Sequence, residues 1–435
     1  MILSKGQTEY STAREAGVWN GLVPARYPQV IARPRSSTEV QQLVRRAATD
    51  RHRISIRSGG HDYHGACLRD GGMLIDLGSL NAVNVEAGKG EAWAGPGSTN
   101  LMLVRSAHSR GFAFPTGHSS SVGLGGYILG GGLGWNPTEW GPACWSVSAI
   151  RAVTVDGDLI EADCEHHDDL FWAARGGAAG FPAVVTGFKL RLQPLPCVMS
   201  CRLVYPLDAL PFLLTWARDI ETPGLEISVV ARRSEPIFQD GRASARIALT
   251  GFGSTVDRAR SLVHSAISEA FAPENMLDSS EPVDVPFKEL EAEGSWITGL
   301  RYGVDGGWID HDLERIGGIC ENALKHSPSK LSRIVFARGQ YPAPAPDVAF
   351  TVLGSMTAHV YGTWEHEKDD RANHTWVRDL ISEIGPGFTG FWAAQSNLQA
   401  APGRARASFS PEKWDRLSRI REHYDPERRK HSFLE

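Results

Sequence analysis

Cysteine is scarce in this 435-residue chain, and long apolar or basic runs are missing. The cysteines form no CxxC pair, so neither a zinc cage nor a disulfide framework is expected, and no metal site is predicted. A formal net charge of −5 without a basic block argues against a nucleic-acid partner or an acidic membrane. No unbroken apolar run reaches the roughly 20 residues that span a bilayer, and the N-terminus lacks the basic start and apolar core of a signal peptide. A cytoplasmic location is therefore expected.

Strands and helices alternate over the first 195 residues. The stretch "RISIR" alternates as a strand, and Ser36 with Glu39 forms a capping box before a helical apolar pattern. A second helix is predicted from Ser98 to Gly111, and the Asp156-Gly157 pair predicts a β-hairpin. Hydrophobic content of 42% and this length together predict a soluble protein of two or three structural units.

The pattern of expected helices and strands changes after Pro196. Longer amphipathic helices such as "VDRARSLVHSAISEAF" alternate with strands such as "RASARIALTGFG", which predicts a second domain of sheet and helices. The segment 364–374, "WEHEKDDRANH", mixes histidines and carboxylates at loose spacing. This composition is compatible with a metal site, but a solvated loop is the better interpretation. The last 40 residues again predict a helix, with "DP" as its stop signal.

Two glycine-rich segments carry the strongest signal. In "ISIRSGGHDYHGAC" (54–67), His61 follows two glycines at the end of a strand, where it could ligate a metal, act as a base, cap a turn or carry a cofactor. The run "PTGHSSSVGLGGYILGGGLGW" (115–135) presents backbone N–H groups of the kind that bind phosphate. It does not fit a nicotinamide fingerprint, because more glycine follows where a clean helix is needed. Gly59 and Gly125 are expected to need positive φ or close approach to phosphate.

Four segments, in order, carry a resemblance to a known family: "RSGGHDYHG", "GLGGYILGGGLG", "DLFWAARGG" with "AVVTGFKLRL", and "RLSRIREHYDPERR". The chain resembles the berberine bridge enzyme-like oxidases of the vanillyl-alcohol oxidase superfamily, and most of all their 6-hydroxy-D-nicotine oxidase group. The resemblance implies an α+β, two-domain FAD-binding fold. Residues 1–195 and 395–435 would bind FAD, and residues 196–394 would form a substrate domain with an antiparallel sheet covered by helices.

The resemblance also implies that His61 is bonded covalently to the 8α-methyl of FAD. A second tether through a cysteine is not expected, because Ser119 stands at that position. Trp145 stands where an aspartate is common, and either Val184 or Val185 would contact the flavin. The residues expected to bind the cofactor are Arg57, Ser58, Gly59, Gly60, His61, Asp62, Tyr63, Gly117, His118, Val122, Gly123, Gly125, Gly126, Val185 and Asn397.

On the substrate side, "RIVFARGQY" replaces the lysine and glutamates of the nicotine oxidase group and offers Ile334, Phe336 and Arg338. Phe336 and Arg338 should share one strand face, as should His359 and Tyr361. If these faces meet the flavin, they would form an aromatic pocket wall with one arginine and one histidine. A wall of this kind favours substrates with flat, neutral or anionic rings. The expected catalytic residues are Tyr127, Arg338, His359 and Tyr361, with Trp135, Trp308 and Tyr341 as further lining candidates. Core packing explains each aromatic equally well, and a strand histidine is more often a core residue than a base.

The implied activity is oxidation of a small cyclic or aromatic alcohol or amine, by hydride transfer to flavin N5. Dioxygen would reoxidise the flavin and give hydrogen peroxide. The expected partners are therefore a small-molecule substrate and dioxygen, with no nucleic acid and no membrane, and a homodimer is left open. Two alternatives are a dehydrogenase with another electron acceptor and a flavin-bearing protein that sequesters a toxic natural product.

Overall fold

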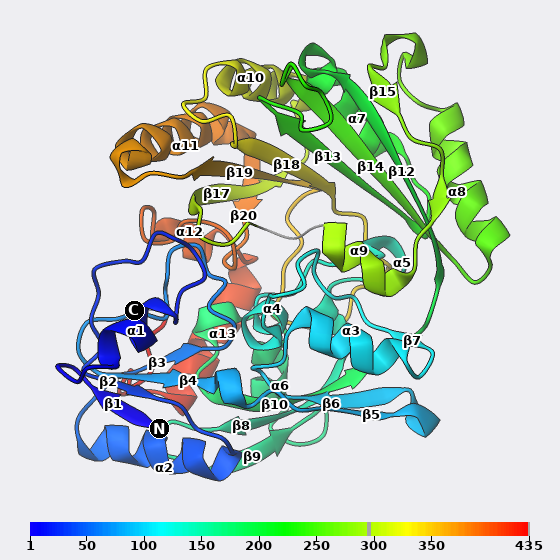
Figure 1. Ribbon diagram of the computed structural model, residues 1–435. Helices are drawn as coiled ribbons and strands as arrows, with labels where there is room; N and C mark the ends of the chain where they lie inside the picture. Colours follow the sequence, from blue (N-terminus) through cyan, green and yellow to red (C-terminus); the bar gives the residue numbers. More distant parts are fainter. Residues whose placement is uncertain (294–296, 434–435) are drawn as a thin grey trace.

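The computed structural model describes residues 1–293 and 297–433 and shows two stacked parts, each of sheet and helix (Figure 1). The lower part contains strands β1 (Ile2–Ser4), β2 (Val30–Ala32), β3 (Ile54–Arg57), β4 (Met73–Asp76), β5 (Val83–Glu86), β6 (Glu91–Ala94), β7 (Phe112–Ala113), β8 (Val147–Val153), β9 (Leu159–Ala162), β10 (Val184–Arg191) and β11 (Gln193–Pro194). Its helices are α1 (Tyr10–Glu15), α2 (Ser37–Thr49), α3 (Asn100–His108), α4 (Leu124–Leu129), α5 (Pro137–Trp140), α6 (Asp168–Ala174), α12 (Gly403–Arg406) and α13 (Pro411–Tyr424).

Two sheets organise this lower part. The first has the order β1-β2-β4-β3, in which β4 runs parallel to both β2 and β3. The second has the order β5-β6-β10-β8-β9 and is antiparallel throughout. Strand β3 ends where the His61 loop begins, so the sheet fixes the start of that loop.

The upper part is built on one antiparallel sheet. Its strands are β12 (Cys197–Pro206), β13 (Leu225–Arg232), β14 (Ser244–Gly253), β15 (Asp278–Ser279), β16 (Val283–Asp284), β17 (Arg301–Ile309), β18 (Arg333–Arg338), β19 (Met356–Trp364) and β20 (Phe388–Phe391). Their order is β15-β12-β14-β13-β18-β19-β17-β20, and β16 also pairs with β12. The helices are α7 (Leu210–Asp219), α8 (Val256–Ser268), α9 (Phe287–Glu293), α10 (Leu313–Lys325) and α11 (Asp370–Ile384).

One face of this large sheet is covered by α7, α8, α10 and α11 (Figure 1). Apolar side chains from these helices and from alternate strand positions form a single buried cluster there. The opposite face therefore turns toward the lower part. Helix α13 returns to the lower part, where Leu417 and Ile420 pack in the same core cluster as Leu170 of α6. The domain boundaries near residues 195 and 394 stay predictions.

Several local predictions are confirmed. Ser36 accepts a hydrogen bond from Glu39 N at 3.2 Å at the start of α2, although the Glu39 carboxylate accepts from Arg35 N instead of closing the box. Strands β8 and β9 pair across the predicted Asp156-Gly157 hairpin. Helix α3 is shorter than predicted at both ends, because the Thr99 side chain caps it by accepting from Met102 N.

The loop predicted at 364–374 is wrong in its second half. Helix α11 begins at Asp370, whose carboxylate accepts from Trp364 Nε1 at 2.7 Å and pairs with Arg301 at 2.6 Å. The helix is stabilised further along, where Val377, Leu380 and two isoleucines are buried at helical spacing. The polar start of the segment therefore hid an amphipathic helix. Among the described residues no group of three or more histidine, cysteine or acidic side chains could hold a metal ion.

None of the helices in the described ranges is long and apolar enough to cross a membrane.

Candidate functional site

The two glycine-rich loops touch through their backbones. A Cβ atom on Gly59 would lie 2.5 Å from Gly123 N, and one on Gly123 would lie 2.5 Å from Gly59 N. A Cβ on Gly125 would lie 2.8 Å from Ser58 Oγ. These approaches are too close for any side chain, so glycine is required here by loop-to-loop contact. Of the two alternatives expected for Gly59 and Gly125, positive φ is excluded and close approach to phosphate stays a prediction; in the first loop Gly60 and Gly65 have positive φ, 73° and 57°.

His61 lies where the two loops meet. Its Nε2 is 2.9 Å from Ser121 Oγ of the second loop, and its ring stacks on Trp19 with 4.7 Å between ring centroids. Burial, assisted by the nearby Arg57 guanidinium, lowers the pKa of His61 to about 4. The imidazole is therefore neutral at physiological pH and keeps a nucleophilic nitrogen lone pair.

Other residues of the first loop hold its shape. Arg57 donates to Asp76 Oδ1 at 2.8 Å, and Ser58 Oγ donates to the Pro96 carbonyl. Asp62 Oδ1 accepts from two backbone N–H groups further along its own turn, at 3.0 and 2.8 Å. Arg57, Ser58 and Asp62 were all predicted to bind the cofactor. Their side chains form hydrogen bonds within the protein, so they fix the loop that carries His61.

The second loop is tied to the upper part through His118. Its Nε2 lies 2.5 Å from Glu226 Oε1 of β13, and Glu226 Oε2 accepts from Asn136 N at 3.1 Å. Ser119, next in sequence, is buried, and its Oγ is 3.5 Å from Ser121 Oγ. This predicted cofactor loop thus joins the large sheet to the His61 site.

Tyr127 of α4 is anchored within the glycine run. Its hydroxyl donates to the Pro115 carbonyl at 2.7 Å. A Cβ on Gly117 would lie 3.1 Å from the Tyr127 ring, and one on Gly132 would lie 2.9 Å from it. Tyr127 therefore shapes the run that includes Gly117, Val122, Gly123 and Gly126, and its catalytic role stays a prediction.

Val184 and Val185 lie on opposite sides of β10. Val184 belongs to the core cluster under α2, whereas Val185 belongs to the cluster that contains Leu124 and Ile128 of α4. Because α4 continues the second glycine loop, the structure places Val185 on the side of that loop.

Phe336 and Arg338 pair with Ala358 and Met356, so they share one face of β18 as predicted, but the Phe336 side chain does not face the His61 loop. Phe336 is fully buried with Ile334 in the cluster under the helices, on the far face of the large sheet. Arg338 stands at the end of β18, where its guanidinium donates to the Leu225 carbonyl. Each face of β18 carries one arginine and two apolar residues, although only the even positions are fully buried, so its sequence does not show which residues point where.

His359 and Tyr361 share the other face of the sheet, as predicted. Cross-strand pairing places Val335 opposite His359 and Arg333 opposite Tyr361, so Arg333, Val335 and Ala337 are the β18 residues on this face. Tyr361 packs with Tyr63 of the first loop at 5.9 Å between ring centroids. This face thus meets the His61 loop directly.

Several buried polar atoms on this face have no hydrogen-bond partner among the described residues, among them His359 Nε2, Trp308 Nε1 and Thr363 Oγ1. Burial lowers the pKa of His359 to about 4, so the ring is neutral. Buried polar atoms are nearly always paired, and unpaired ones suggest that a ligand completes the site.

Comparisons with known proteins agree with this geometry. A family model described as an FAD binding domain matches residues 28–163, which include both glycine loops. FAD-linked oxidoreductase nodO of Hypoxylon pulicicidum is 26% identical over 436 residues, which cover 96% of this chain and 95% of that protein. (R)-6-hydroxynicotine oxidase of Paenarthrobacter nicotinovorans is 26% identical over 453 residues, which cover 96% and 93%.

The chain is an FAD-linked oxidoreductase related to 6-hydroxynicotine oxidase. Its homologues also include berberine bridge enzyme-like proteins. The crystal structure of 6-hydroxy-D-nicotine oxidase from Arthrobacter nicotinovorans matches with a TM-score of 0.86 at 22% identity, covering 100% of this chain and 97% of that one. This likeness confirms the predicted α+β fold with its antiparallel sheet.

The C-terminal segment of the oxidoreductase closes the site from the edge of the large sheet. Asn397 N donates to Asp305 Oδ1 at 3.0 Å, and its side-chain Oδ1 accepts from Ala400 N at 3.0 Å. Gln395 Oε1 accepts from the Tyr361 hydroxyl at 3.2 Å. Asn397 is therefore held at β17, and its side chain forms a turn of its own.

Sequence reasoning missed Trp19, Glu226 and Arg333. Trp19 stands in "GVWNG", which has no periodic pattern, and it reaches His61 only through the fold. Glu226 is the polar residue at the second position of β13 and meets a histidine 108 residues away. The signals that could have found Glu226 and Arg333 are polar residues within otherwise apolar strands.

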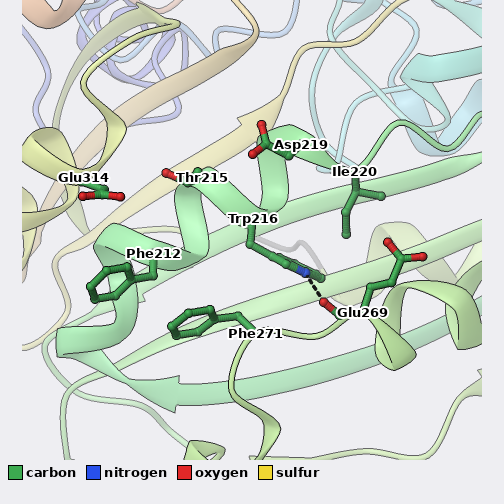
Figure 2. Close-up of a pocket in the computed structure, with 8 residues that line it drawn as sticks. All are labelled: Phe212, Thr215, Trp216, Asp219, Ile220, Glu269, Phe271 and Glu314. Carbon is green, nitrogen blue, oxygen red and sulfur yellow. Dashed lines mark hydrogen bonds between the residues drawn. The ribbon is translucent and has the colours of Figure 1, made fainter.

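A surface hollow of about 350 Å³ lies elsewhere in the oxidoreductase (Figure 2). It is formed by α7 and the chain after α8, with Phe212 stacked on Phe271 at 5.4 Å and Trp216 Nε1 donating to the Glu269 carbonyl at 2.7 Å. Because α7 covers the far face of the large sheet, this hollow is separate from the His61 site.

Proposed function

We propose that this oxidoreductase is an oxidase that carries FAD covalently on His61 and oxidises a small cyclic or aromatic alcohol or amine. The observation that carries the proposal is a neutral imidazole at the contact of two glycine loops, inside the segment matched by the FAD-binding model. When bound, FAD would accept a hydride from the substrate and pass the electrons to dioxygen, giving hydrogen peroxide.

The chain's own residues support a covalent tether at His61. Attachment of the flavin would need an unprotonated nitrogen on the chain, and the low pKa of His61 supplies one. Trp19 fixes the plane of the imidazole, and Ser121 Oγ fixes the direction of Nε2. Both contacts reduce the number of orientations that the ring can adopt before it reacts.

A single tether is proposed. Ser119 stands where a second linkage would need a thiol, and the thiol of Cys144 is fully buried, which raises its pKa to about 12. A protonated, buried thiol is a poor nucleophile.

On the substrate side, Tyr361 and His359 present a hydroxyl and a neutral imidazole from the sheet face that meets the loops. Neutral His359 can accept a proton from a substrate hydroxyl or amine, provided that the group lies within hydrogen-bond reach. The proposed partners are a small-molecule substrate and dioxygen.

The first test is acid precipitation of the purified protein. Yellow colour and flavin fluorescence should remain with the chain, and peptide mapping should give one flavin-bearing peptide, which contains His61. Flavin released from the unaltered protein by acid, or His61→Ala protein that still retains acid-stable flavin, would refute the tether.

The second test is anaerobic mixing with a panel of aromatic alcohols and cyclic amines. Bleaching of the flavin followed by recovery of its colour in air identifies an oxidase. Recovery only with a dye acceptor would identify a dehydrogenase instead. A ligand that binds without bleaching would support a sequestration role.

A further inference from the structure

The surface hollow at α7 has an aromatic lining. Phe212 and Trp216 come from α7, and Phe271 comes from the chain that follows α8 (Figure 2). Phe212 stacks on Phe271 with 11° between the ring planes, yet Phe212 remains 49% exposed. The two rings are therefore held together at the surface instead of being buried in the core, and an exposed apolar patch of this kind often marks a binding site.

The hollow offers aromatic surface more than directed hydrogen bonds. Trp216 Nε1 already donates to the Glu269 carbonyl at 2.7 Å, so both of these groups are occupied and the indole ring is fixed. Thr215 contributes a hydroxyl to the lining. The volume of about 350 Å³ lies at the lower end of the range for small-molecule sites, roughly 300–1,000 Å³. The hollow is therefore of a size for a small ligand that is recognised mainly by ring contact.

Three exposed carboxylates lie around these rings, on different sides of Trp216 (Figure 2). Asp219 ends α7, Glu269 follows α8, and Glu314 lies in the first turn of α10. Asp219 accepts from Arg218 Nε at 2.7 Å, whereas Glu269 and Glu314 form no ion pair within the described ranges. The described residues that line the hollow include no basic side chain. About two negative charges therefore remain uncompensated around an aromatic lining.

This combination is complementary to a cation. The faces of aromatic rings attract cations, and quaternary ammonium groups are commonly recognised in this way. Exposed carboxylates add an attraction that salt weakens. A quaternary ammonium has no N–H group that the rings would leave unpaired, so it fits the lining better than a primary ammonium does.

We propose that the hollow binds a small organic cation, in which a quaternary ammonium group is carried by an apolar body. The site is independent of the proposed function, because α7 covers the face of the large sheet that is turned away from the His61 loop.

The test is calorimetric titration of the flavin-loaded protein at low ionic strength with acetylcholine and with 3,3-dimethylbutyl acetate, which has the same shape without the charge. Acetylcholine should bind at least ten-fold more tightly than the neutral ester. Phe212→Leu, which removes an exposed ring and keeps an apolar side chain, should weaken acetylcholine at least five-fold. Protein with both Glu269→Gln and Glu314→Gln should weaken acetylcholine at least ten-fold and leave the neutral ester within two-fold.

Glu383→Gln is the matched control, because Glu383 is an exposed glutamate of α11 that does not line the hollow. It should leave the acetylcholine affinity within two-fold. Equal affinity for the two esters, unchanged acetylcholine affinity in Phe212→Leu protein, or an equal loss with Glu383→Gln would overturn the proposal. Binding of N-acetylargininamide without binding of acetylcholine would also overturn it, since the hollow would then receive a basic segment of another protein.

Discussion

The two sides of the candidate site are built in different ways. The lower side is backbone: Gly59 and Gly123 bring two loops into contact, and His61 is presented at their junction. The upper side is made of side chains on strands, where Arg333, His359 and Tyr361 project from neighbouring strands of one face. A backbone cradle tolerates almost no added atom, whereas a strand face can change its side chains without changing the sheet. We therefore expect the lower side to decide whether flavin binds and the upper side to decide what is oxidised.

The largest effect is expected from a substitution that adds a side chain where the two glycine loops touch. Gly59→Val would force a Cβ to within 2.5 Å of Gly123 N, and relief requires the loops to separate. We expect flavin content to fall at least ten-fold and stability to fall by about 3 kcal/mol, at the upper end of the usual cost of overpacking. Absorbance at the flavin band and urea unfolding measure the two effects.

Gly88→Ala is the control for this variant, because a Cβ at Gly88 meets no atom within 4 Å and this exposed glycine lies outside both glycine loops. It should leave flavin content unchanged. Normal flavin content in Gly59→Val protein would mean that the loop contact is dispensable.

The second test concerns which side of the large sheet the Phe336 side chain occupies. Phe336→Ala empties a buried site in the cluster between the sheet and its helices, so we expect a loss of about 3–5 kcal/mol in the free energy of unfolding. The flavin spectrum and the substrate preference should not change. Altered substrate preference with unchanged stability would contradict this position and would mean that Phe336 faces the flavin.

The third test uses pH. The unfolded chain protonates His359 near pH 6.5, whereas the folded protein does so only near pH 4. Between these values the unfolded state binds more protons, so stability should fall as pH drops through this window, by about 3 kcal/mol from His359 alone. Urea unfolding at about pH 7 and about pH 4.5 measures the loss.

His359→Asn should remove the contribution of His359 to the change of unfolding free energy with pH. The contribution of His61 should remain, because its pKa is also lowered in the folded protein. An unchanged slope in the His359→Asn protein would show that His359 is not desolvated in solution.

The smallest expected effect is that of Tyr127→Phe. It removes the hydrogen bond from the hydroxyl to the Pro115 carbonyl, which should cost about 1 kcal/mol of stability. Flavin should stay bound. A fall of ten-fold or more in the rate of anaerobic flavin reduction, with stability nearly unchanged, would give Tyr127 a catalytic role in place of a structural one.

The sequence by itself determined much of the lower part. Strand β3, the hairpin at Asp156-Gly157 and the placement of His61 directly after a strand all follow from short-range patterns of alternation and glycine. The need for glycine at positions 59 and 125 was also visible, although its cause was not. These features are local, so neighbouring residues suffice to specify them.

Only the tertiary structure decided the upper side. Each face of β18 carries one arginine and two apolar residues, so alternation could not tell that Arg333 faces the site and Phe336 does not. Trp19 meets His61 only through the packing of the lower part, and His118 meets Glu226 only because the second glycine loop lies against the large sheet. A strand with the same kinds of side chain on both faces carries no sequence signal of direction, and contacts between distant segments leave no local pattern. These residues could therefore be assigned only from the folded chain.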